Sequence, residues 1–146
     1  MDDINWLSMV LATLAPLVVG SVFYHPVVFG KALVDLPDVK ADKRKTIFAF
    51  AIILVFSFFL SFFLLNFNNS GINQEGQFDT FRHGAWHGTF VAITIAAPVI
   101  LINGFFGKRP WKHTLIHLLF WIITLALMGG MLDAMNHWEN VILPEG

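Results

Sequence analysis

Four long apolar segments dominate this sequence and limit what it can fold into. They lie near Asn5–Tyr24, Thr46–Phe67, His83–Phe106 and His113–Asn136. Each is long enough to cross a hydrocarbon core of about 30 Å as a helix, which takes roughly 20 residues. Hydrophobic residues make up 56% of the 146-residue chain, more than a soluble domain of this size can bury. We therefore predict an all-α, polytopic integral membrane protein with four transmembrane helices in one domain, residues 1–146.

The distribution of basic residues predicts the orientation of these spans. Eight of the nine Lys and Arg residues fall in two loops, residues 25–45 and 107–112, and Arg82 is the exception. Because basic loops stay in the cytoplasm, we expect both loops there and both termini outside. The acidic start, Met1-Asp2-Asp3, lacks the basic region of a signal peptide, so the first span is expected to be retained.

Small residues at a spacing of four predict which spans pack closely. Such stripes occur in spans one, three and four: Ser8, Ala12, Pro16 and Gly20; Gly84, Gly88, Ala92 and Ala96; Ala126, Gly130 and Ala134. Inside lipid, small side chains let helix backbones approach each other. We expect these three spans to form a tight core. Span two carries phenylalanines on all sides and is expected to be peripheral, facing lipid.

Several classes of function are disfavoured by what the sequence lacks. It contains no cysteine, which excludes disulfides, thiolate nucleophiles and thiolate metal sites. A formal net charge of −1 gives no sign of a nucleic-acid partner. No nucleotide-binding fingerprint or Ser/His/Asp set is present either. We therefore expect a protein that is not an enzyme, with the lipid bilayer and either itself or another membrane protein as partners.

Histidines near the outer ends of spans three and four form a candidate metal site. His83 and His87 are four residues apart and share one face of a helix. Asp133 and His137 share a face of span four with part of its small-residue stripe. If the two spans are neighbours, three imidazoles and a carboxylate could bind a divalent metal such as zinc. The alternative is that these are ordinary interfacial histidines, with Asp133 accepting hydrogen bonds from nearby donors.

A second, weaker cluster is expected near the cytoplasmic ends of the spans. It contains His25, His113 and His117, of which the last two again have a spacing of four. Pro26 biases His25 away from helical geometry, so span one should end or kink there. A hinge with an interfacial anchor is the simpler interpretation of this stretch.

Several motifs resemble those of one membrane-protein family. They are Asn5-Trp6, Gly20, the Tyr-x-Pro-x-x-Phe-Gly-Lys element from Tyr24 to Lys31, Asn103–Pro110 and Leu125–Met131. Together they are similar to the domain of unknown function 1761 family of small four-helix proteins, over nearly the whole chain. The HGAWHG form of span three looks like a Bacteroidetes-type variant. Other members have apolar or small residues in place of His83 and His87, which argues against a family-wide metal site. The resemblance implies a bacterial inner-membrane protein with periplasmic termini, and it implies no activity.

Three hypotheses for function follow from these features. The favoured one is a protein that acts by assembly, as a self-associating bundle or an accessory subunit of a membrane complex. The alternative is a small oligomeric ion or metal transporter or channel that uses the His/Asp clusters at the two membrane faces. The third is a membrane metalloenzyme, which would need an open coordination position and a general base, and only Asp79 and Asp133 are available as that base.

Overall fold

The computed structural model describes residues 4–33, 43–68 and 80–136, and every long element in these residues is helical. Four helical runs are long and apolar enough to cross a membrane. They are α1 (Trp6–Phe23), α2 (Lys43–Asn68), the run of α3 (Phe81–Val91), η3 (Ala92–Ala96) and α4 (Ala97–Phe106), and α5 (Trp111–Met135). The predicted all-α fold with four spans is confirmed. The largest difference in a boundary is at α2, which begins at Lys43 instead of Thr46.

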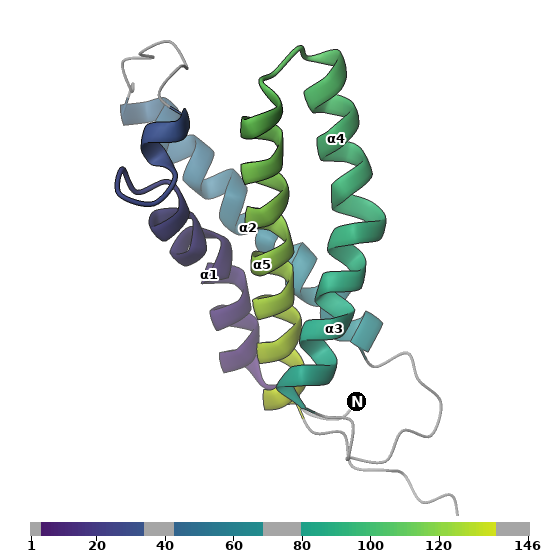
Figure 1. Ribbon diagram of the computed structural model, residues 1–146. Coiled ribbons are helices and arrows are strands. Elements are labelled where there is room, and N and C mark those ends of the chain that lie inside the picture. The colour runs from purple at the N-terminus through teal and green to yellow at the C-terminus, as the bar shows by residue number, and fades with distance from the viewer. Residues whose placement is uncertain (1–3, 34–42, 69–79, 137–146) are drawn as a thin grey trace, which may run out of the picture.

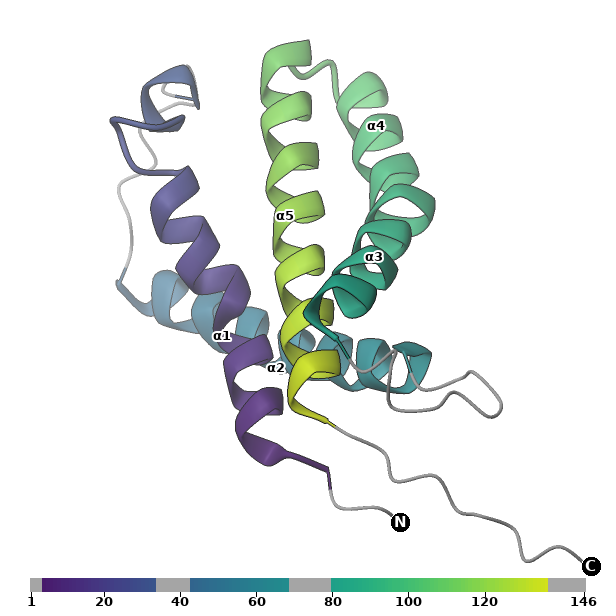
Figure 2. The ribbon, with the colours of Figure 1, turned by 60° about the horizontal axis from the view of Figure 1, so that its bottom comes forward.

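Helix α5 lies at the centre of the bundle. Helix α1 packs on one side of it and α3 on the other (Figure 1). Figure 2 shows α1 and α5 close together where α1 begins and α5 ends, and further apart towards the opposite end. The sequence predicts a tight core of spans one, three and four. The structure instead has α1 and α3 packing mainly on α5, because buried side chains occur on several faces of α5.

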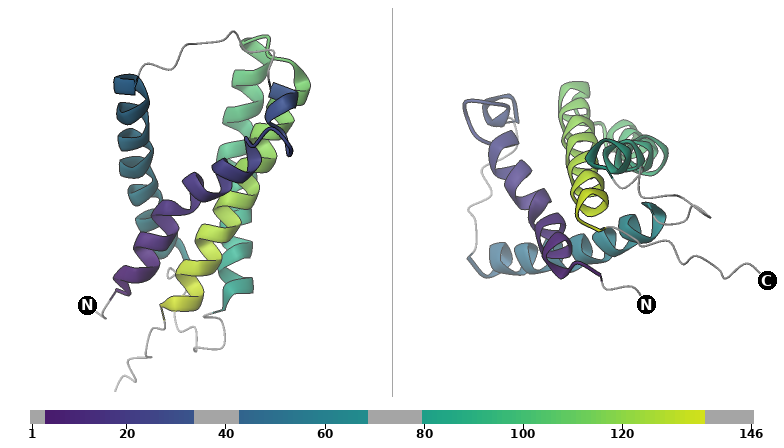
Figure 3. Two further views of the ribbon diagram at one scale, coloured as in Figure 1. Left: turned by 90° about the vertical axis from the view of Figure 1, so that its left-hand side faces the viewer. Right: turned by 90° about the horizontal axis from the view of Figure 1, so that it is seen from below.

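Helix α2 is peripheral, as predicted, and only its second half joins the bundle. Residues 43–56 have no buried side chain among those described, whereas Ser57, Ser61, Leu64 and Leu65 are buried against α1 and α5. The left view in Figure 3 shows the first half of α2 standing apart from the other helices. The exposed side chains there are mostly Phe, Ile and Val, which suit contact with lipid tails.

The small-residue stripes are used inside the chain. Every member of the three stripes is buried or half-buried. The closest packing is between α3 and α5, where Gly84 and Gly88 lie against the backbone of α5. Assembly with other chains, which the stripes suggested, would therefore have to use other faces of the bundle.

A widened turn lets the third span continue past a proline. Residues Ala92–Ala96 form the π-helix η3, and Pro98 follows in the first turn of α4. Proline lacks an amide hydrogen, and its ring crowds the carbonyl four residues earlier. A π-type turn just before the proline relieves this conflict locally. The span from α3 to α4 therefore crosses as one continuous helical run.

A hydrogen-bonded turn with a lysine in an unfavourable conformation connects α4 to α5. The Lys108 amide donates to the Phe105 carbonyl at 3.2 Å, and the Arg109 amide donates to the Gly104 carbonyl at 3.0 Å. These two bonds form a Schellman motif, whose left-handed position usually carries glycine. Here Lys108 occupies it with φ 51°. A side chain in this conformation costs about 1 kcal/mol relative to glycine.

Polar side chains join the start of α1 to the end of α5. The Asn136 side-chain oxygen accepts from the Asn5 amide at 2.8 Å, and its nitrogen donates to the Ser8 hydroxyl at 2.8 Å. The Asn5 side chain in turn donates to the Met135 carbonyl at 2.9 Å. Ser8 and Asn136 are buried, so these bonds satisfy groups that would otherwise be costly in an apolar bundle. They also hold the start of α1 and the end of α5 at the same end of the molecule.

Candidate functional site

Thr80 determines where α3 begins and therefore where its histidines lie. Its backbone is extended, and its hydroxyl accepts a hydrogen bond from the His83 amide at 3.2 Å. Such a cap satisfies one of the open amides in the first helical turn and contributes about 1 kcal/mol. The helix then begins at Phe81, so His83 lies in its first turn and His87 one turn later.

Two glycines bring this part of α3 into backbone contact with α5. A methyl group on Gly84 would overlap the Gly129 carbonyl, and one on Gly88 would overlap the Leu125 carbonyl. Only glycine allows backbones to approach this closely. Because His83 precedes Gly84, the same contact carries its imidazole to Asp133, one turn further along α5 from Gly129.

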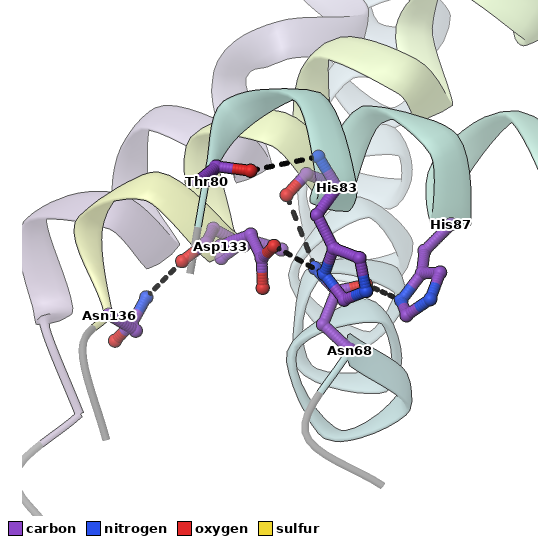
Figure 4. A network of polar contacts seen from close by, with 8 residues as sticks. Asn68, Thr80, His83, His87, Asp133 and Asn136 are labelled. Carbon is purple, nitrogen blue, oxygen red and sulfur yellow. Dashed lines mark hydrogen bonds and ion pairs between the residues drawn. The ribbon is translucent and has the colours of Figure 1, made fainter. Parts of the chain in front are cut away.

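His83 is paired with Asp133 inside the bundle. The His83 Nδ1 and Asp133 Oδ2 atoms are 2.9 Å apart, and their side chains are 20% and 8% exposed (Figure 4). A carboxylate only accepts hydrogen bonds, so the proton of this bond is on Nδ1. The pair offsets part of the cost of placing a carboxylate within a membrane-spanning helix.

His87 is held by Asn68, the last residue of α2. The two side chains meet at 3.1 Å, between His87 Nδ1 and Asn68 Oδ1. The Asn68 amide nitrogen donates to the Gly129 carbonyl at 3.2 Å, which directs its oxygen towards the imidazole. His87 therefore also donates from Nδ1. Asn68 is buried and connects α2 to both α3 and α5 (Figure 4).

The two imidazoles form an oriented pair. Their ring centroids are 4.2 Å apart. With the proton on Nδ1, the neutral form of each ring has its lone pair on Nε2. Metal-binding histidines commonly show this arrangement, with one ring nitrogen donating to an oxygen that orients the ring. The pair is chemically suited to bind a metal ion or a proton.

Three of the four outer candidate residues lie in the described part of the chain, and the structure brings these three together. His83, His87 and Asp133 converge, whereas His137 lies outside the described residues. Asp133 contacts His83 at Nδ1, the position of a carboxylate that orients an imidazole. Within residues 4–33, 43–68 and 80–136, no three His, Asp or Glu side chains form a group that would hold a metal ion by themselves.

The inner candidate residues lie near the opposite end of the bundle, where His117 and His25 bond to different groups. His117 Nδ1 is 2.9 Å from the Tyr24 hydroxyl. His113 is buried, and the exposed His25 accepts from the Val27 amide at 3.3 Å. Sixteen residues of α5, roughly 24 Å, separate His117 from Asp133.

Asn68 is the site residue that the sequence analysis missed. It comes at the end of a phenylalanine-rich run, where an amide ordinarily marks the return to water. Its distance of 19 residues from His87 gives no helical periodicity that would relate the two. A polar residue at the end of an otherwise charge-free span was the available signal.

Comparison with known proteins places most of this chain within one family model. The model with the description "Protein of unknown function (DUF1761)" matches residues 7–132. The matched range includes His83, His87 and Asn68 and ends one residue before Asp133. No curated protein and no solved structure matches the chain.

Proposed function

This chain belongs to the DUF1761 family, and we propose that it binds a divalent transition-metal ion through His83 and His87, at one end of its membrane-spanning bundle. The observation that carries the proposal is the imidazole pair, with ring centroids 4.2 Å apart. Each ring is oriented by an oxygen from another helix, Asp133 on α5 or Asn68 on α2.

The ligand chemistry favours ions such as zinc over calcium or magnesium. Imidazole nitrogen suits zinc, copper and nickel, whereas the harder ions prefer several oxygens. Asp133 supplies negative charge behind His83 and strengthens it as a ligand. His83 also lines a cavity of about 580 Å³, together with Arg82 and Trp86. Water or a further side chain would complete the coordination.

The geometry of the histidine pair supports metal binding, which is one step of a transport function. A transporter using both membrane faces would need a second site, and at the inner end His117 bonds to Tyr24 whereas His25 accepts from the Val27 amide. We therefore restrict the proposal to a metal-binding membrane protein. A metal-activated enzyme would further need a general base beside the imidazoles.

Zinc binding can be measured on the full chain in nanodiscs of neutral lipid. After treatment with a chelator, we expect one tightly bound zinc per wild-type chain by titration and elemental analysis. His83→Ala and His87→Ala should each lower the zinc affinity at least tenfold, because each removes one of the two imidazole ligands. His25→Ala, at the opposite end of the bundle, is the matched control and should keep wild-type affinity.

Two outcomes would contradict the metal proposal. One is a folded wild-type protein that binds no zinc, copper or nickel. The other is unchanged binding in both α3 variants. Circular dichroism and thermal melting of each variant establish that a loss of binding does not reflect a loss of fold.

The proposed location is a bacterial inner membrane, with the histidine pair on the periplasmic side. The described basic residues Lys31, Lys43, Arg44, Lys108, Arg109 and Lys112 all belong to the end where α1 and α4 finish. Arg82 belongs to the other end, next to His83. This asymmetry supports cytoplasmic basic loops under the positive-inside rule.

Single cysteines test the orientation, because the natural chain has none. Lys31 and Arg82 are both exposed and lie at opposite ends of the bundle. In intact spheroplasts, a membrane-impermeant maleimide should label Arg82→Cys and should label Lys31→Cys only after permeabilisation. The reverse pattern would place the histidine pair on the cytoplasmic side.

A further inference from the structure

A pocket of about 570 Å³ lies between α4 and α5, at the end opposite the histidine pair. Its polar wall contains Asn103, Arg109, Thr114, His117 and Trp121. Arginine, asparagine and the indole of tryptophan all present N–H donors, which is the chemistry that recognises an oxyanion. The pocket is separate from the proposed metal site and does not depend on it.

Two polar side chains in this wall, Thr114 and His117, carry groups that could form hydrogen bonds to a ligand. The Thr114 hydroxyl is buried and has no hydrogen-bond partner among the described residues. Such a group is unusual in a folded protein and suggests a missing partner. His117 lines the same wall, and its Nδ1 is joined to the Tyr24 hydroxyl. Burial raises the pKa of Tyr24, so this phenol brings no negative charge that would oppose an anion.

The charge around the pocket is positive. Lys108 precedes Arg109 in the α4–α5 connection, and Lys112 follows it in the first turn of α5. The one carboxylate among the described residues, Asp133, is near the far end of α5. No described acidic side chain therefore competes for the arginine of the pocket. Among residues 4–33, 43–68 and 80–136, an anion bound here would displace no ion pair.

The conformation of Lys108 also points to a role for this charge. Its φ of 51° is a left-handed conformation that glycine adopts without strain. Non-glycine residues in this conformation concentrate at functional sites, where surrounding structure holds them. At the end of α4, a glycine would form the same helix-ending turn but would remove one cation from beside the pocket.

The surroundings of the pocket are those of a lipid-facing surface. Phe106 and Ile100 contribute its apolar wall, and Phe105 and Phe106 are 78% and 77% exposed. Trp111, at the start of α5, is also exposed, as tryptophans in a headgroup belt are. A ligand at this place would have its apolar part among lipid tails and its charged part beside Arg109.

We propose that the pocket between α4 and α5 binds the phosphate group of an anionic phospholipid. Arg109 and Asn103 bind the phosphate oxygens, and His117 and Trp121 donate further bonds from α5. The acyl chains lie against Phe106 and Ile100. Lys108 adds long-range attraction, worth roughly tenfold or less in affinity for a single surface charge.

Lipid titration followed by native mass spectrometry tests this site on the delipidated full chain in neutral detergent. We expect phosphatidylglycerol to bind at least tenfold more tightly than phosphatidylcholine, with one high-affinity lipid per chain. Arg109→Gln should remove this preference. Lys112→Gln removes the same charge from the first turn of α5, outside the pocket wall, so it should lower the affinity severalfold at most and leave the preference for phosphatidylglycerol in place.

Lys108→Gly separates a role in binding from a role in folding. We expect it to raise the melting temperature by about 3 °C, because the strain at this position is relieved. At the same time, its affinity for phosphatidylglycerol should fall severalfold. A stabilised variant with unchanged lipid affinity would overturn the assignment of Lys108.

Inorganic phosphate distinguishes a lipid from a soluble ligand. We expect millimolar phosphate to leave the bound phosphatidylglycerol in place, because it lacks the acyl chains that contact the apolar wall. Displacement of the lipid by phosphate would identify a soluble anion as the ligand and overturn the lipid assignment. Equal effects of Arg109→Gln and Lys112→Gln would show attraction to the whole loop and would overturn the pocket.

Discussion

Gly88→Ala is expected to destabilise the bundle by about 3 kcal/mol and to disturb the histidine pair with it. The added methyl group would overlap the Leu125 carbonyl of α5. That obstacle is backbone within a helix, so it cannot move aside as a flexible side chain would. Helix α3 would have to shift away from α5, and the bond between His83 and Asp133 would lengthen or break. The measurement is thermal unfolding in detergent or nanodiscs, together with zinc titration.

Gly20→Ala is the matched control for this substitution. It lies in α1, and a methyl group there would be 3.7 Å from the Phe120 ring, an ordinary contact distance. Alanine is also the better helix former, so we expect a melting temperature equal to or slightly above that of wild type. Equal melting temperatures for the two alanine variants would contradict the α3–α5 backbone contact.

Asn68→Leu is expected to weaken zinc binding 10- to 100-fold while both imidazoles remain in the chain. Asn68 accepts from His87 and donates to the Gly129 carbonyl, so it acts as a positioning residue. Leucine has a similar size but offers no oxygen, and His87 would lose the partner that selects its orientation. Loss of an orienting partner around a metal commonly has an effect of this size. Zinc titration and melting of the same preparation measure both consequences.

Asn66→Leu tests whether any amide on α2 would have the same effect. Asn66 is exposed and donates to the Phe62 carbonyl of its own helix, at 2.7 Å. This variant should bind zinc as tightly as the wild type. A folded Asn68→Leu protein with wild-type zinc affinity would show that His87 is not oriented through Asn68. That result would overturn the positioning role of Asn68, and the His83 and His87 variants would still decide the metal proposal.

The spans were predictable because lipid imposes a local rule on the chain. A segment in hydrocarbon must satisfy its own backbone hydrogen bonds, so an apolar run of about 20 residues becomes a helix whatever its neighbours are. The widened turn at Ala92–Ala96 was not predicted, although Pro98 indicates where a distortion could occur. The turn absorbs the proline without ending the span.

Part of the candidate site was also predictable, because helical periodicity is local. A spacing of four puts His83 and His87 on one face, and the glycines beside them indicate a nearby helix. If spans three and four were neighbours, these residues could meet near Asp133, and the structure places His83 against it. His137, the fourth residue of the expected set, lies outside the described residues.

The sequence by itself therefore determined four helical spans, their approximate ends and the peripheral position of the second span. Tertiary structure alone decided that α5 is the centre, that Asn68 holds His87, and that a polar pocket lies between α4 and α5. The physical reason is the range of the interactions. Helix formation in lipid depends on neighbouring residues, whereas the choice of partner and its rotation depend on packing between segments far apart in the chain.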